Sequence, residues 1–366
     1  MNGASESYSH VFPALKGHQA GRDYYVAMCP LKLIPRIFLF DEDELPAEFR
    51  AQRPLNRARI PEIAQYLVNN PKEYVFSSIT ASVDAGPRFE PLPDNADVGR
   101  LIVPMAAQFV INDGQHRRAA IEEALRQRPE LGEETISVVI FIDGGLQRSQ
   151  QMFADLNQYA IRPTKSLGIL YDLRNPLSQL ARKLITAVPA FRGLTEMEKT
   201  TISNRSTKLF TLSSIYQGTQ ALLSKNRAEM ISSSEEDLAA EFWTETSRHI
   251  PEWQLAMAKK IAPADLRRDY VHAHGLALHA LGIAGNILLA EEPVSWKSRL
   301  VRLGNVDWLR SNSDVWEGRA LISGRVSKAH TNVSLTAAYL KAILGMPLTA
   351  EERRLEDACA RKVSVQ

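Results

Sequence analysis

The residue types best suited to binding chemistry lie together at residues 113–117, which read Asp-Gly-Gln-His-Arg. This segment, the DGQHR turn, follows the apolar run Phe109–Ile111 and precedes a helical pattern that extends to Arg126. The pattern predicts a strand that runs into a polar, glycine-containing turn and then into a helix. We expect Asp113 to cap this helix, because its carboxylate can accept from free backbone amides, and Gly114 to let a backbone or ligand approach closely.

Gln115, His116 and Arg117 then fall in the first turn of that helix. Unpaired amides and the positive end of the helix dipole make the start of a helix a suitable place for a phosphate. A basic side chain there can add a bidentate contact to the anion. The alternative is a capped surface helix whose polar side chains are only solvated, and the residue types alone do not decide between the two.

The DGQHR turn is also the main sequence feature that the chain shares with a known protein family. The chain resembles the DGQHR-domain proteins, and most closely the DndB family of bacterial DNA phosphorothioation (sulfur modification) systems. Segments 56–67, 153–157 and 162–167 agree with that family in order and spacing, so the resemblance covers at least residues 24–220. The family in turn is similar to the ParB-like nuclease fold, in which such a turn faces a pocket for a nucleotide or a DNA phosphate. The resemblance therefore implies a nucleotide or phosphate site formed by Asp113, Gly114, Gln115, His116, Arg117, Asn157, Arg162 and Lys165.

Positive charge is concentrated in one part of the chain. Residues 146–210 hold ten basic and four acidic side chains, a net charge of +6, whereas the whole chain carries only +2. Clustered positive charge attracts the phosphate backbone of double-stranded DNA without reading its sequence. The alternative to DNA binding is that these cations lie on solvated helix faces and loops. The same two interpretations apply to Thr200–Lys208 and Gly324–Lys328, which combine hydroxyls or glycine with cations. The candidate DNA contacts are Arg57, Arg59, Arg174, Arg182, Lys183, Arg205 and Lys208.

Other kinds of site receive less support. His272 and His279 are two helical turns apart, which is too far for a metal-binding pair, and no metal site is predicted. The two cysteines, Cys29 and Cys359, show no disulfide or zinc spacing, and Cys29 is expected to be a buried thiol. Neither a signal peptide nor an apolar run of membrane-spanning length is visible, so we expect a cytoplasmic protein without a membrane partner.

The elements that position these residues change in character along the chain. Apolar content of 45% and charged content of 23% are those of a globular chain, and 366 residues favour two domains. Strands such as Tyr24–Met28 and Arg36–Phe40 alternate with helices at first, and helices prevail after about residue 150. We therefore predict an α+β protein, with strands and helices over residues 21–190 and a mainly helical domain over 191–366. The resemblance implies that the first of these domains is a ParB-like mixed sheet with its helices. Residues 1–20 are expected to be a flexible N-terminus.

The resemblance implies a DNA-binding negative regulator of transcription of the phosphorothioation gene cluster. Its expected partners are promoter DNA and other phosphorothioation proteins, and a homo-oligomer and a nucleotide cofactor stay open. The alternative is a nucleotide-hydrolysing or DNA-nicking enzyme. In that case Asp113 would orient a metal or a water, His116 would act as general acid or base, and Arg117 would stabilise phosphoryl charge.

Overall fold

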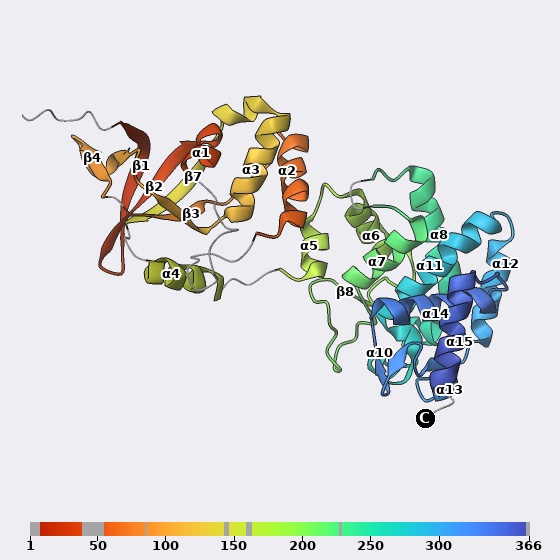
Figure 1. Ribbon diagram of the computed structural model, residues 1–366. Coiled ribbons are helices and arrows are strands. Elements are labelled where there is room, and N and C mark those ends of the chain that lie inside the picture. Colours follow the sequence, from red (N-terminus) through yellow and green to blue (C-terminus); the bar gives the residue numbers. More distant parts are fainter. Residues whose placement is uncertain are drawn as a thin grey trace, which may run out of the picture. The chain divides into compact units, whose positions relative to one another are not determined.

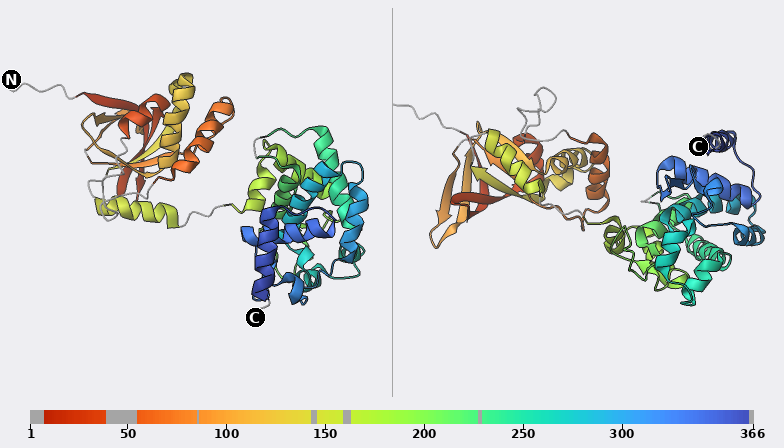
Figure 2. Two further views of the ribbon diagram at one scale, coloured as in Figure 1. Left: turned by 45° about the vertical axis from the view of Figure 1, so that its right-hand side comes forward. Right: turned by 90° about the horizontal axis from the view of Figure 1, so that it is seen from below.

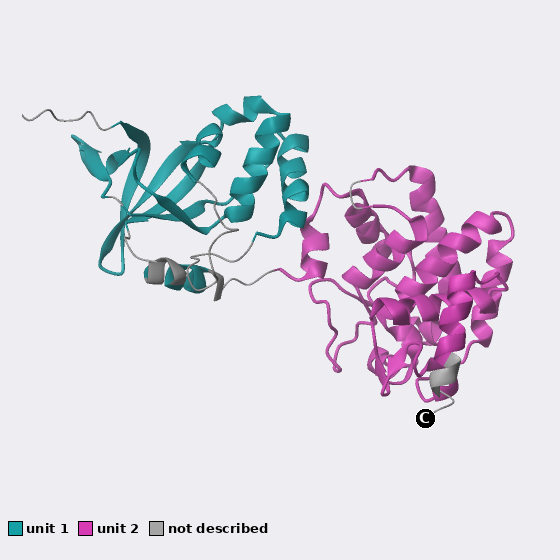
Figure 3. Ribbon diagram, in the orientation of Figure 1, with its two compact units in different colours: residues 1–161 teal, residues 162–366 magenta. Residues whose placement is uncertain are grey.

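The computed structural model describes residues 8–38, 55–84, 86–142, 146–158, 163–226 and 229–363. The chain forms two compact units, residues 1–161 and 162–366 (Figure 1, Figure 3). Helix α6 (Pro176–Ala187) belongs to the second unit, because its buried Leu177, Leu180 and Leu184 lie in the hydrophobic core of that unit. The division therefore comes earlier in the chain than the boundary near residue 190 that the sequence suggested.

The first unit contains a mixed sheet of seven strands in the order β4-β5-β1-β2-β7-β3-β6. Only β3 and β7 pair in parallel among the described strands of this sheet, and the other neighbours are antiparallel. This mixed sheet confirms the predicted fold class. The strands are β1 (Ser9–Gln19), β2 (Arg22–Pro30), β3 (Ile79–Val83), β4 (Arg88–Leu92), β5 (Asn95–Pro104), β6 (Phe109–Asp113) and β7 (Thr135–Ile142).

The expectation of a flexible N-terminus is wrong for residues 9–19, which form β1. This strand lies in the interior of the sheet, between β2 and β5. Its Phe12 and Ala14 are buried, and residues 20 and 21 form the tight turn to β2 with positive φ angles of 51° and 75°. Burial of alternate side chains and pairing on both edges order a segment that looks loose by composition alone.

The prediction of a strand over Arg36–Phe40 is also wrong. Residues Ile34–Ile37 form the short helix α1, and residues 39 and 40 lie outside the described part of the chain. Pro35 stands at the first turn of this helix, where its fixed φ suits the helix and its missing N–H costs nothing. Ile34 and Phe38 are buried in the core of the first unit, so this apolar run packs as a helix end rather than pairing with the sheet.

Three longer helices accompany the sheet: α2 (Ile60–Asn69), α3 (Gln115–Gln127) and α4 (Leu146–Gln158). The periodicity of residues 60–67 predicted α2 correctly, and its Ala64 and Leu67 are buried. Helices α2 and α3 pack against each other (Figure 2), and α4 packs against β6. Three elements from distant parts of the sequence therefore meet around the end of β6.

The second unit is mainly helical, as expected. Helix α11 (Gly275–Glu291) lies at its centre and packs against α7 (Leu212–Leu223) and α14 (His330–Ile343) (Figure 1). Two short strand pairs accompany the helices, β8 (Thr195–Glu196) with β9 (Phe210–Thr211) and β10 (Leu321–Ile322) with β11 (Arg325–Val326). No helix among the described residues combines the length and apolar character needed to cross a lipid bilayer. Besides α6, the helices are α5 (Lys165–Tyr171), α7 (Leu212–Leu223), α8 (Ser233–Arg248), α9 (Pro251–Met257), α10 (Pro263–Asp269), α11 (Gly275–Glu291), α12 (Trp296–Leu300), α13 (Ser313–Trp316), α14 (His330–Ile343) and α15 (Ala350–Val363).

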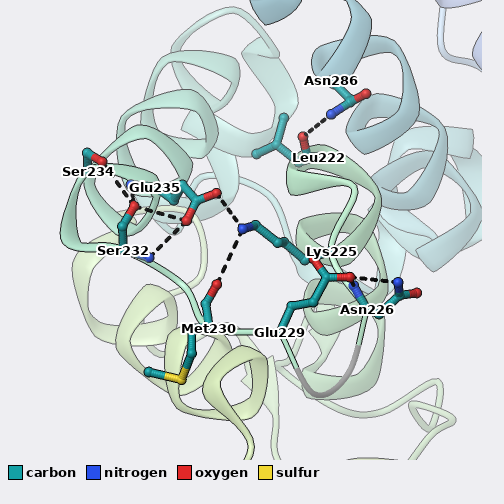
Figure 4. A network of polar contacts seen from close by, with 9 residues as sticks. All are labelled: Leu222, Lys225, Asn226, Glu229, Met230, Ser232, Ser234, Glu235 and Asn286. Atoms are coloured by element: carbon teal, nitrogen blue, oxygen red, sulfur yellow. Dashed lines mark hydrogen bonds and ion pairs between the residues drawn. The ribbon is translucent and has the colours of Figure 1, made fainter.

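The connection from α7 to α8 is held by a polar network (Figure 4). The Ser232 side chain accepts a hydrogen bond from the Glu235 backbone N–H, and the Glu235 carboxylate accepts one from the Ser232 backbone N–H at 2.8 Å. The Lys225 ammonium lies 2.9 Å from the same carboxylate and also donates to the Met230 carbonyl. The Ser232 bond and then the Lys225 bond lower the pKa of Glu235 to about 2, so this carboxylate stays charged and fixes the start of α8.

Candidate functional site

The DGQHR turn connects the end of β6 at Asp113 to the start of α3 at Gln115, as the sequence predicts. Gly114 between them has a φ of +112°, which side chains rarely tolerate. A Cβ at this position would also lie 3.0 Å from Cγ1 of Ile79 and 3.1 Å from Nη2 of Arg117. Glycine is therefore needed both for the turn and for the close approach of the Arg117 side chain.

Asp113 does not cap α3, contrary to the expectation. The N-cap position is Gly114, and no side chain makes a capping hydrogen bond there. Asp113 is still part of β6 and pairs with Thr80, so its carboxylate accepts instead from Nη2 of Arg117 at 2.6 Å. The first amides of α3 are thus left without a side-chain cap.

Arg117 is tied to the sheet by two bonds from the same nitrogen. Its Nη2 donates to Asp113 and also to the backbone carbonyl of Ser78 at 3.0 Å, just before β3 begins. Its Nε is buried and has no hydrogen-bond partner among the described residues. Arg117 therefore joins α3 to β3 and β6, while its buried Nε donor has no partner among the described residues.

A cavity of about 190 Å³ lies at the DGQHR turn. The 3₁₀ turn before α2 contributes Arg59 to its wall, α2 contributes Ile63, and α4 contributes Phe153. Gln115, another wall residue, is only 5% exposed, and its side-chain Nε2 has no acceptor within the described part of the chain. Because a buried donor without an acceptor is costly, the unpaired groups of Gln115 and Arg117 favour a ligand that brings acceptor oxygens.

His116 makes a specific contact with the segment before α2. Its Nε2 lies 3.1 Å from the backbone nitrogen of Asn56, which donates to it. The proton of a neutral His116 ring is therefore on Nδ1. The Asn56 side chain in turn accepts from the backbone N–H of Ala58 and caps the 3₁₀ turn Arg57–Arg59. His116 thus helps to hold Arg59 beside the cavity.

The other predicted members of this site are placed differently. Arg59 lines the cavity, whereas Arg57 is exposed and is not one of the wall residues. Lys165 begins α5 in the second unit. Arg162 and the side chain of Asn157 lie outside the described part of the chain.

The sequence analysis missed Asn112, which also lines the cavity and is fully buried. Its side-chain Oδ1 accepts from the Ser82 hydroxyl at 2.8 Å. An amide inside an otherwise apolar strand was the one signal that could have revealed this residue.

Much of the positive charge of residues 146–210 is engaged in structural contacts. Arg182 donates to the backbone carbonyls of residues 169, 170 and 172 and so closes the end of α5. Lys183 pairs with Glu236 at 2.6 Å, and Lys208 donates to the Gly193 carbonyl at 2.8 Å. Arg174 and Arg205 are exposed, and Arg205 makes no polar contact with other described residues. The charge of Lys183 is therefore neutralised by a carboxylate, and Arg182 and Lys208 have hydrogen-bond donors committed to the protein itself.

The remaining histidine and cysteine predictions concern buried groups. His272 is fully buried, its Nδ1 accepts from Nε1 of Trp253 at 3.0 Å, and burial lowers its pKa. In the described ranges, no group of three or more His, Cys, Asp or Glu side chains is arranged to hold a metal ion. Cys29 is buried as expected, and burial raises the pKa of its thiol to about 12, which keeps it protonated.

Comparison with known proteins gives one match. No curated protein and no solved structure matches the chain significantly. Residues 12–347, which span both units and nearly the whole chain, match the DndB family, described as DNA-sulfur modification-associated. The resemblance that the DGQHR turn and its companion segments indicated is thereby confirmed, and the chain belongs to the DndB family.

Proposed function

We propose that this protein is a DNA-binding negative regulator of transcription of the phosphorothioation gene cluster. In this proposal the cavity at the DGQHR turn receives a phosphate group, either from the DNA backbone or from an effector nucleotide. Membership of a family associated with DNA sulfur modification supports the biological context. The structural observation that supports phosphate binding is that Gln115 Nε2 and Arg117 Nε have no hydrogen-bond acceptor among the described residues. Both residues line a cavity that Arg59 also lines.

The charges at this cavity support an anionic ligand. Asp113, the one carboxylate among the described wall residues, is already paired with Arg117. The Arg59 guanidinium adds a further positive charge without an ion pair within the described part of the chain. The backbone amides that begin α3 add donors and the positive end of a helix of 13 residues.

The geometry favours binding over hydrolysis. A catalytic Asp113 would have to leave the 2.6 Å bond to Arg117, and a general base at Nε2 of His116 would have to release the Asn56 amide. Both side chains thus serve to position neighbouring groups. The enzymatic alternative is tested by incubation with nucleoside triphosphates and with supercoiled plasmid, with and without Mg²⁺; phosphate release or nicking would support it.

Arg59 offers a better probe of DNA binding than Arg117, because Arg117 also supports the fold. A mobility-shift assay compares the upstream region of the gene cluster with unrelated DNA of equal length. For Arg59→Ala we expect the affinity for the upstream region to fall and the slope of log affinity against log salt to decrease by about one, the signature of one lost phosphate contact. Gln115→Met should weaken binding by removal of the amide donor.

Arg22→Ala is the matched control. Arg22 is exposed at the turn between β1 and β2 and is not a wall residue of the cavity, so its loss should leave the affinity unchanged. Equal affinity of the wild-type protein for unrelated DNA, together with an unchanged transcript level after deletion of the gene, would refute the regulatory proposal.

A further inference from the structure

The second unit contains a larger cavity, of about 560 Å³. Its walls come from the loop that follows residue 199, from α10, from the start of α11, and from the segments around residues 310 and 328. Four of the wall residues are cationic, and none of the described wall residues is Asp or Glu. The cationic ones are Arg267, Arg268, Arg310 and Lys328.

Two of these cations are held rigidly by backbone carbonyls. Arg267 Nη2 donates to the carbonyls of Ser203 and Ser206 at 2.8 and 3.1 Å. Arg310 donates through Nη1 to the Arg268 carbonyl at 2.9 Å and through Nη2 to the Gly324 carbonyl at 2.6 Å. Carbonyl groups satisfy the donors but carry no net charge, so neither guanidinium group forms an ion pair with a carboxylate of the described residues. Burial lowers the pKa of Arg267, because it removes the guanidinium from water.

Arg268 differs from the other three cations. Its guanidinium donates to both carboxylate oxygens of Asp269, at 2.9 and 2.7 Å, and to Asp265 at 2.8 Å. Its charge is neutralised by these neighbours. The wall cations without an ion pair among the described residues are therefore Arg267, Arg310 and Lys328.

Lys328 lies against the beginning of α11. A Cβ built on Gly275, the first residue of that helix, would be 2.9 Å from the Lys328 Nζ. Helix α11 has 17 residues, and its N-cap residue His274 makes no side-chain capping bond. Because a helix begins at the positive end of its dipole, an ammonium group at this place is electrostatically unfavourable.

Neighbouring groups increase this cost rather than relieve it. Burial and the nearby Lys165 ammonium lower the pKa of Lys328, and no carboxylate of the described ranges pairs with it. His274 is neutral at physiological pH, because burial lowers its pKa to about 4, and its Nε2 donates to the Arg267 carbonyl at 2.9 Å. A cavity that gathers cations at a helix start without counter-charge is arranged for an anion supplied from outside.

We propose that this cavity of the second unit binds the phosphate groups of a nucleotide-sized small molecule. Its volume falls in the range of small-molecule sites, whereas a DNA duplex requires an open surface. Besides the cations, the wall offers hydroxyl groups of Thr200 and Thr201 and the apolar side chains of Ile202 and Leu209. Such a combination suits a ligand with a phosphate end and a less polar body. This inference goes beyond the proposed function, because it concerns a separate cavity in a different unit.

Competition binding with the full-length protein tests this inference. The probe is ATP carrying a fluorescent group on its ribose, and the competitors are unlabelled ATP, AMP, adenosine and inorganic triphosphate. We expect ATP and triphosphate to displace the probe, AMP to displace it more weakly and adenosine not to displace it. Failure of both ATP and triphosphate to bind, or equal competition by adenosine and ATP, would overturn the proposal.

Substitutions then assign the binding to this cavity. Lys328→Gln should weaken probe binding at least tenfold, whereas Lys328→Arg should retain most of it. Lys260→Gln is the matched control, because Lys260 is an exposed lysine of the same unit that is not a wall residue. Wild-type affinity in Lys328→Gln, or an equal loss of affinity in Lys260→Gln, would contradict the assignment.

Discussion

The ring Nε2 of His116 accepts a hydrogen bond from the backbone amide of Asn56 at 3.1 Å. This bond connects the first turn of α3 to the segment that leads into α2. Since the Asn56 side chain caps the turn that carries Arg59, the bond links the DGQHR turn to the most exposed cation of the cavity. His116 is thus a positioning residue.

This role predicts which replacements of His116 are tolerated. His116→Leu removes the acceptor and should reduce affinity for the upstream DNA about as much as Arg59→Ala, because Arg59 is then no longer held beside the cavity. His116→Gln can present its side-chain oxygen to the Asn56 amide and should retain most of the affinity. Mobility shifts measure the DNA affinity of each single variant and of the double variant Arg59→Ala/His116→Leu. A loss in the double variant equal to the sum of the single losses would contradict the positioning role.

The DGQHR turn also predicts a stability effect. Gly114→Ala forces a side chain into the left-handed region, at about 1–2 kcal/mol, and adds crowding against Ile79 and Arg117. Gly21→Ala is the control, because Gly21 also has a positive φ but no atom near its missing Cβ. We expect Gly114→Ala to cost more than Gly21→Ala. Amide hydrogen exchange of β6 and α3 measures the difference, and equal effects would show that the crowding at the turn is unimportant.

Arg182 and Arg205 should separate structural from DNA-contacting cations. Arg182→Ala leaves the carbonyls at the end of α5 without their donor and should lower the stability of the second unit, with unchanged DNA affinity in the folded protein. Arg205→Ala should lower DNA affinity without changing stability. All five tryptophans lie in the second unit, so tryptophan fluorescence during urea unfolding reports on that unit. If Arg205→Ala instead lowered stability and left DNA affinity unchanged, Arg205 would be excluded as a DNA contact.

The second unit should lose stability in mildly acidic solution. Burial lowers the pKa of His274 from 6.5 to about 4 and also lowers the pKa values of His272 and His279. The unfolded chain therefore binds protons that the folded protein does not. The contribution of these neutral histidines to the free energy of unfolding is complete above pH 6.5 and is lost as the pH falls from 6.5 toward 4. His274→Gln should flatten this dependence, as measured by urea midpoints between pH 7.5 and pH 5, and an unchanged slope would show that His274 does not contribute.

Local patterns predicted the elements around the first cavity. The period of residues 60–67 and the apolar run before the DGQHR turn are short-range signals, and they correctly gave α2, β6 and α3. Strand β1 was missed because its order depends on pairing with β5, some ninety residues later, which no local pattern records.

The roles of individual cations were harder to predict for the same reason. The partners of Arg182 are backbone carbonyls, which any residue carries, so the sequence holds no trace of these bonds. Asp113 looked like a helix cap because the residue types fit, but β6 extends through it and turns its carboxylate toward Arg117. The cavity of the second unit joins residues from 200 to 328, a grouping that only the packing of α10 and α11 creates.

The strand order has a consequence for synthesis of the chain. Strand β7 is the last of the seven along the sequence, yet it lies between β2 and β3. Without it the sheet would consist of two separate pieces, β4-β5-β1-β2 and β3-β6. The first unit can therefore not complete its sheet until residue 142 has left the ribosome, by which time the DGQHR turn has already been made. Until then both edges that β7 will cover stay open to wrong partners, and a truncated chain must include β7 to fold.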